Sequence, residues 1–226
     1  MAREGEVVAA AADPVRERGG GDAIQAKSAK GLYLYGLARA RSLRSPFRGT
    51  DPENTRIRYR DVDALVRAVP FQVPVAEPAL LQQHQQVLEI AMRRGTVLPV
   101  PFGIVFRDRR ELLRFLEDQY LVIDEGLSFL DGHFEMRLHI SPQDGEATPE
   151  LHGVAQHVYA DLRRNARAAL PLPGQPGRLL TAAFLVDRGA WVEFVERAED
   201  LDVAHPGVDV DVTGPWPAYD FVKLAR

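Results

Sequence analysis

Histidines and carboxylates are the side chains of this 226-residue sequence that could support acid–base or metal chemistry. In the alternating stretch HFEMRLHI, His133, Glu135, Arg137 and His139 share one face, which we expect to point outward. Six residues along a strand place the two histidines roughly 20 Å apart, too far for one coordination sphere. Geometry therefore excludes a metal shared by this pair.

The other pairs are equally poor as metal or catalytic sites. His152 and His157 lie five residues apart in a helical pattern, so they diverge by about 140° around the helix. Asp209 and Asp211 form a D-x-D pattern, but valines alternate with them, which favours a solvated strand face. The sequence contains no P-loop, dinucleotide-binding glycine motif, G-x-S-x-G or H-E-x-x-H. Because it also lacks cysteine, thiol nucleophiles and cysteine-bound metals are excluded.

His84 lies within a predicted helix that begins at Pro78 and ends at Gly95. Leucines, valine and alanine recur beside it at helical spacing, so the histidine belongs on or beside the apolar stripe. A lone histidine in such a stripe is more often a hydrogen-bonded residue at the edge of the core than a base or a ligand. We favour this structural interpretation.

The one locally basic region runs from Arg39 to Arg60. Arg56, Arg58 and Arg60 alternate with Ile57 and Tyr59, so a strand there would present a guanidinium face. This face is either a docking surface for an acidic partner or a solvated strand, and we favour the second interpretation. A net charge of -4 gives the whole chain no general attraction to nucleic acid.

Composition and length are those of an ordinary folded protein, with 46% hydrophobic and 27% charged residues. Residues 1–30 are predicted to be a disordered tail, because they are rich in Ala, Gly, Arg and Glu and contain a triple glycine. No apolar run approaches the roughly 20 residues that a membrane-spanning helix needs. We therefore expect no membrane span.

Hydrophobic periodicity predicts two α+β halves that meet near residues 131–133. The buried stretch VLPVPFGIVF (Val97–Phe106) is predicted to be a strand whose entrance is made irregular by Pro99 and Pro101, with regular pairing from about Phe102. The other predicted strands are 31–38, 133–140, 178–187 and a C-terminal strand from Val208, and the other predicted helices are 61–69, 108–130, 150–170 and 191–201.

Several segments occur in the order typical of one protein family: Leu32–Gly36, His84, Leu98–Phe106, Glu135, Ala182–Asp187 and Thr213–Val222. On these segments the chain resembles the gas vesicle protein F/L family (GvpF/GvpL). The last of them, TGPWPAYDFV, is the most specific. The family usually has an arginine where this chain has Pro101, and a tryptophan where it has Met136.

The resemblance implies two α+β domains, residues 31–131 and 132–226, the first a modified ferredoxin-like fold. It also implies an accessory or minor structural protein of gas vesicles, in the cytoplasm. Its partner would be the small hydrophobic shell protein, which it would help to nucleate and keep from aggregating. Other gas vesicle accessory proteins are further candidate partners. No enzymatic activity, cofactor, metal or nucleic acid is implied.

Arg56, Arg58, Arg60, Trp216 and Tyr219 are the candidate partner-binding residues. The segment GPWPAYDFV is either a rigid clasp between the domains or a docking site, because its prolines fix the backbone around the tryptophan. Two other functions stay open at this point. One is a small-molecule enzyme using His84 or the His133/Glu135/His139 face, and the other is an RNA-binding module using the basic region.

Overall fold

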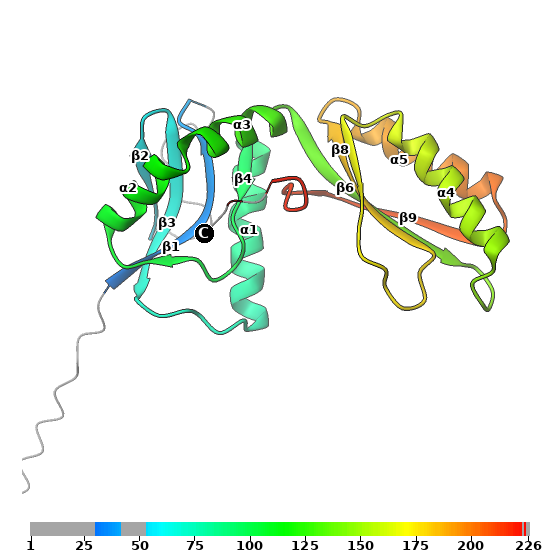
Figure 1. Ribbon diagram of the computed structural model, residues 1–226, viewed down its shortest axis with the longest axis horizontal. Coiled ribbons are helices and arrows are strands. Elements are labelled where there is room, and N and C mark those ends of the chain that lie inside the picture. The colour runs from blue at the N-terminus through cyan, green and yellow to red at the C-terminus, as the bar shows by residue number, and fades with distance from the viewer. Residues whose placement is uncertain (1–29, 42–52, 223, 225–226) are drawn as a thin grey trace, which may run out of the picture.

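Residues 30–41, 53–222 and 224 are described by the computed structural model, which contains two antiparallel sheets in two α+β units (Figure 1). The predicted tail lies outside the described residues, except for Lys30, which begins the first strand. The N-terminal unit contains β1 (Lys30–Arg39), β2 (Asn54–Tyr59), β3 (Val62–Pro70), α1 (Pro78–Arg94), β4 (Val97–Pro99), β5 (Val105–Phe106), α2 (Arg109–Asp118) and α3 (Tyr120–Leu130). The C-terminal unit contains β6 (His133–Pro142), α4 (Pro149–Arg163), β7 (Ala168–Pro171), β8 (Leu180–Asp187), α5 (Trp191–Ala204) and β9 (Val208–Trp216).

The predicted α+β class is confirmed, and the two sheets share one strand order. The C-terminal order is β7-β8-β6-β9 along a β-α-β-β-α-β chain, which is the ferredoxin-like arrangement. The N-terminal order is β2-β3-β1-β4. When the strands of each unit are numbered in chain order, this is the same spatial order as in the C-terminal sheet. β5 pairs with β1 beside β4. The N-terminal unit is modified by the helices α2 and α3, which follow β5.

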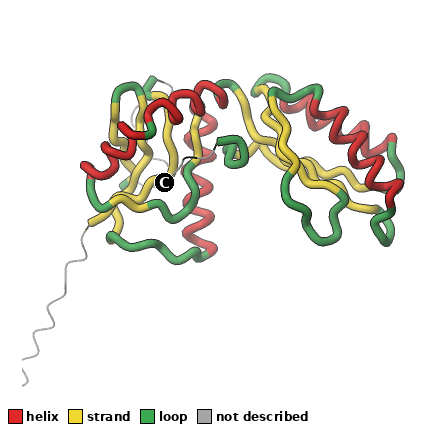
Figure 2. Tube along the Cα trace, viewed as in Figure 1, coloured by secondary structure: helices red, strands yellow, loops and turns green. Residues whose placement is uncertain are grey.

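Helices cover the N-terminal sheet on both faces and the C-terminal sheet on one face (Figure 2). On one face of the N-terminal sheet, α1 packs Val87 and Leu88 against Tyr33 and Tyr35. On the other face, α2 and α3 bury leucines against Leu34 and Leu37. In the C-terminal unit, α4 and α5 together cover the face that carries Met136, Leu138, Phe184 and Val210. Among the described residues, no helix has both the length and the apolar character that crossing a bilayer requires.

Three predictions about individual elements were wrong. The segment predicted as a helix at 61–69 is strand β3, which lies between β1 and β2. Because helices cover both faces of this sheet, apolar residues lie on both faces of β3. The helix predicted at 108–130 is two helices separated at Gln119. The helix predicted at 150–170 ends at Arg163, and β7 follows it as an edge strand of the second sheet.

The apolar stretch Val97–Phe106 forms two short strands instead of one. Pairing begins at Val97, earlier than predicted, and stops at Pro99; it resumes at Val105 on the same edge of β1. Pro101 and Gly103 lie in the connecting loop, and Gly103 has a φ of 97°, which favours glycine. This loop brings Phe102 to the surface of the unit, where it remains half-buried.

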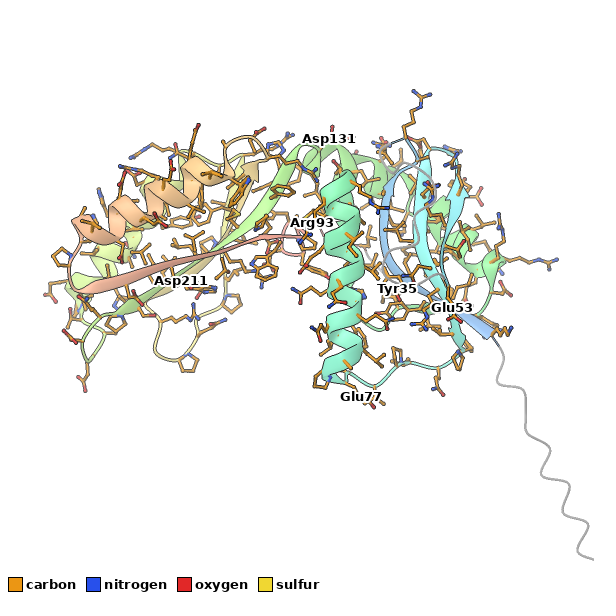
Figure 3. The ribbon with its side chains drawn as sticks, turned by 180° about the vertical axis from the view of Figure 1, so that it is seen from behind. Tyr35, Glu53, Glu77, Arg93, Asp131 and Asp211 are labelled. Carbon is orange, nitrogen blue, oxygen red and sulfur yellow. The ribbon has the colours of Figure 1, made fainter. Side chains whose placement is uncertain are left out.

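One arginine of the second unit holds the end of α1. The Arg188 guanidinium donates from Nη2 to the carbonyls of Met92 (2.6 Å) and Gly95 (3.0 Å). A cation suits this position because the C-terminal carbonyls of a helix carry partial negative charge. The contact ties the C-terminal unit to α1, which stands between the two sheets in Figure 3.

Candidate partner-binding surface around Phe102

Exposed apolar side chains are concentrated in one short segment of the N-terminal unit. Among the described residues, five of the ten large hydrophobic side chains that are exposed lie between residues 71 and 81. Val73 and Val75 are the most open of the five, with 79% and 73% of their surface exposed; the others are Phe71, Leu80 and Leu81. Single exposed apolar residues are common, but a cluster of this kind is a candidate interaction surface.

Three hollows meet at this segment, and Phe102 lines all of them. The sheet hollow, about 300 Å³, lies between Tyr33, Val75 and Leu80. The inter-unit hollow, about 460 Å³, is lined by Leu81, Trp216 and Tyr219 among others. The α2 hollow, about 750 Å³, extends from Val73 to Phe115 and Arg114. We call the 71–81 segment together with these hollows the Phe102 surface.

His84 supports this surface from beneath. It is 4% exposed, and its ring nitrogens contact Tyr33 Oη (2.6 Å, from Nδ1) and the Val100 carbonyl (3.0 Å, from Nε2). Because a carbonyl only accepts, Nε2 carries the proton and Nδ1 accepts from the Tyr33 hydroxyl. Burial lowers the pKa of His84 to about 4, so the ring is neutral near pH 7. Figure 3 shows the neighbouring Tyr35 on the side of the sheet that α1 covers.

This geometry bears on the enzyme hypothesis. His84 lines the inter-unit hollow, but both of its nitrogens are already hydrogen-bonded within the protein. A general base needs a free nitrogen within reach of a substrate proton. The interpretation of His84 as a hydrogen-bonded residue at the edge of the core is therefore the one that the structure supports. Within the described part of the chain, no three His, Cys, Asp or Glu residues are grouped to hold a metal ion.

Trp216 and Tyr219, both predicted partner-binding residues, lie in the same hollow. Trp216 is half-buried and its indole Nε1 donates to Thr213 Oγ1 at 3.2 Å, which fixes the ring on the end of β9. Tyr219 stacks on His84 with ring centroids 6.5 Å apart. Arg137 also lines this hollow, although it is not among the predicted partner-binding residues. Trp, Tyr and Arg are the residue types that dominate binding energy at interfaces.

The expectation that Glu135 points outward was wrong. Glu135 has no exposed surface, because residues 217–222 cover the face of the sheet on which it lies. Its carboxylate accepts from Arg137 Nε at 2.8 Å and from the Asp220 backbone N–H at 3.0 Å. Burial, reinforced by the charge of Asp220, raises the pKa of Glu135 to about 7. The hypothesis of an exposed His133/Glu135/His139 catalytic face therefore loses its carboxylate.

Arg56, Arg58 and Arg60 lie on the β2 side of the N-terminal sheet and line none of the three hollows. Arg56 and Arg58 both donate to the buried Asp63 carboxylate, at 2.9 and 2.8 Å. Arg60 falls in the turn after β2 with a φ of 51°, and its guanidinium lies 4.6 Å from the centroid of the Tyr120 ring. A function in partner binding remains a prediction for all three.

The fold is that of a two-unit α+β protein, and the Phe102 surface is both hollowed and apolar. The model of the family "Gas vesicle synthesis protein GvpL/GvpF" matches residues 31–153 and 146–223. This protein belongs to the GvpL/GvpF family, as the sequence motifs predicted.

Relatives and solved structures agree with this assignment. The chain is 24% identical over 177 residues to gas vesicle protein F2 of Halobacterium salinarum, covering 74% of this chain and 79% of the relative. It is 26% identical over 258 residues to gas vesicle protein L of Streptomyces sp., covering 86% and 93%. The crystal structure of GvpF from Anabaena sp. PCC7120 superposes with a TM-score of 0.76 at 18% identity, covering 87% and 98%. That of GvpF from Microcystis aeruginosa has a TM-score of 0.74 at 19% identity, covering 86% and 99%.

Proposed function

We propose that this protein is an accessory or minor structural protein of gas vesicle formation and acts without catalysis. It binds the small hydrophobic shell protein, assists nucleation of the shell and prevents the free subunits from aggregating. A subunit that forms a wall wetted on one side exposes apolar surface before assembly, and such surface aggregates unless a partner covers it. Family membership supports a place among gas vesicle proteins.

The Phe102 surface is the observation that carries this proposal. Val73 and Val75 are more than 70% exposed, and three hollows beside them accept apolar side chains of a partner. Aromatic walls and a polar rim, to which Gln72 and Gln83 contribute, are typical of sites that bind apolar segments. Binding at this surface would bury the exposed valines against apolar side chains of the shell protein.

Introducing charge into this surface is expected to abolish most of the binding. The variant Val73→Asp/Val75→Asp, co-expressed with the shell protein, should lower the amount of soluble, co-purifying shell protein by at least about tenfold. Two carboxylates would have to be desolvated in the complex, whereas the free variant keeps them in water. Gel filtration and quantitative immunoblotting of the soluble fraction measure the outcome.

Val203→Asp provides the matched control, since Val203 is 83% exposed and lies on α5 in the other unit. It should solubilise the shell protein as well as the wild type does. If the double variant performs as well as this control, the Phe102 surface is not the binding site. If even the wild type leaves the shell protein insoluble and unbound, direct binding of the shell protein is wrong.

A further inference from the structure

The chain after β9 returns from the C-terminal sheet to the N-terminal unit. Ala218 is 5% exposed and belongs to the N-terminal core, against which Phe221, Val222 and Leu224 also pack. Val222 lies so close to Gly126 of α3 that a Cβ added there would stand 3.0 Å from Val222 Cγ1. The segment 217–222 therefore bridges the two units, as the clasp interpretation of GPWPAYDFV predicted.

A cluster of three charges holds this segment on the C-terminal sheet. Glu135 accepts from the Asp220 backbone N–H, and Arg137 Nη2 donates to Asp220 Oδ2 at 2.9 Å. Arg137 also donates to Glu135, so one guanidinium serves two carboxylates. Glu135 is fully buried, whereas Arg137 and Asp220 keep 35% and 27% of their side-chain surface exposed. A buried carboxylate that shares its cation with a second carboxylate is incompletely compensated.

We propose that residues 217–222 form a releasable clasp between the two units, and that ionisation of Glu135 sets how readily the clasp opens. Pro217 and Tyr219 are part of the wall of the inter-unit hollow, so release would widen this hollow and uncover the apolar side chains beneath the segment. The proposal that the clasp opens does not require any partner. Its use in exposing surface to the shell protein rests on the proposed function above.

The sign of the pH dependence follows from the groups around Glu135. Arg137 and Asp220 face it directly, and Tyr219 interacts with it electrostatically, as Tyr219 also does with Glu89 of α1. Burial and Asp220 raise the pKa of Glu135 from 4.5 to about 7 in the closed state, whereas the carboxyl of an opened clasp would return toward 4.5. The closed state thus binds the proton more tightly. Closure is therefore most favoured below pH 4.5. As the pH rises from 4.5 to 7, the equilibrium constant for opening increases by on the order of a hundredfold.

Hydrogen–deuterium exchange of the full chain, without shell protein, tests this inference. Between pH 5 and pH 8, after correction for intrinsic exchange rates, the protection of the backbone amides of residues 218–222 should fall by up to roughly a hundredfold relative to β1 and β3. Glu135→Gln should remove this pH dependence and retain strong protection at pH 8. Glu117→Gln, at an exposed position of α2, should behave as the wild type.

Asp220→Asn keeps the proposal testable if Glu135→Gln fails to fold. It preserves the backbone N–H that bonds to Glu135 but removes a charge that adds to the effect of burial on the Glu135 pKa. The loss of protection between pH 5 and pH 8 should therefore be smaller than in the wild type and complete at a lower pH. Protection that does not change with pH in the wild type, or a Glu135→Gln profile that follows the wild type, overturns the proposal. Because no shell protein is present, such a failure leaves the proposed function untouched.

Discussion

Replacing His84 with alanine is expected to lower the free energy of unfolding by about 4 kcal/mol. The substitution empties a site enclosed by Tyr33, Tyr35, Phe102 and Tyr219, all with ring centroids within 6.5 Å of the imidazole. It also removes a hydrogen-bond partner from the Tyr33 hydroxyl and from the Val100 carbonyl. Urea unfolding followed by circular dichroism measures the loss.

Two variants separate the contributions of the cavity and the hydrogen bonds. Tyr33→Phe removes one hydroxyl and should cost about 1 to 2 kcal/mol, because it leaves Nδ1 of His84 without its donor. Gln86→Ala, at an exposed position of the same helix, should change stability by less than about 0.5 kcal/mol. If His84→Ala costs no more than Gln86→Ala, the ring does not support the Phe102 surface.

The buried His84 is also expected to make the free energy of unfolding of the wild type decrease in acid. The folded pKa of His84 is about 4 against 6.5 when unfolded, so its full contribution is present above pH 6.5. This contribution is lost as the pH falls from 6.5 to 4, because the unfolded chain binds the proton more tightly. Glu135 acts in the opposite direction between pH 7 and pH 4.5 and partly offsets this loss. Urea titrations of the wild type and Glu135→Gln should therefore diverge in acid, with the variant losing stability more steeply.

Periodicity was enough to predict the α+β class and most of the elements, but it could not separate a helix from a strand at residues 61–69. Val62, Leu65, Val66 and Val69 repeat at helical spacing, yet a strand buried on both faces tolerates the same pattern. Only the pairing of β3 between β1 and β2 decides between the two, and that pairing is tertiary. The break at Gln119 escaped prediction for a similar reason, since leucines continue in helical register across it.

The candidate surface was predictable only in part. Trp216 and Tyr219 stand out in the sequence because prolines flank an exposed-looking aromatic motif, and both line the inter-unit hollow. Phe102 and Arg137 gave no such signal. The contacts of Phe102 with Tyr33 and His84, and the position of Arg137 beside Trp216 in the hollow, join residues that are far apart in the sequence. The burial of Glu135 was equally hidden, since the segment that covers it follows 85 residues later in the chain at Asp220.

Asp63→Ala is expected to destabilise the N-terminal unit by about 3 to 4 kcal/mol. The Asp63 side chain is 1% exposed and accepts from Arg56 Nη1 and from Arg58 Nε and Nη2. Removing it breaks the ion pair with the Arg56 guanidinium, which is only 16% exposed. Differential scanning calorimetry of the variant should show a correspondingly lower melting temperature.

Arg58→Ala separates this structural function from partner binding. Arg58 is 57% exposed, and Arg56 still pairs with the buried Asp63 carboxylate in its absence, so Arg58→Ala should lower stability only slightly, and by much less than Asp63→Ala does. A loss of shell-protein binding in Arg58→Ala, with its melting temperature lowered only slightly, would show that the β2 face contributes a second contact beside the Phe102 surface. Retained binding would instead assign Arg56 and Arg58 to holding Asp63 within the sheet. A mild effect of Asp63→Ala on stability would contradict the buried ion pair from which this argument starts.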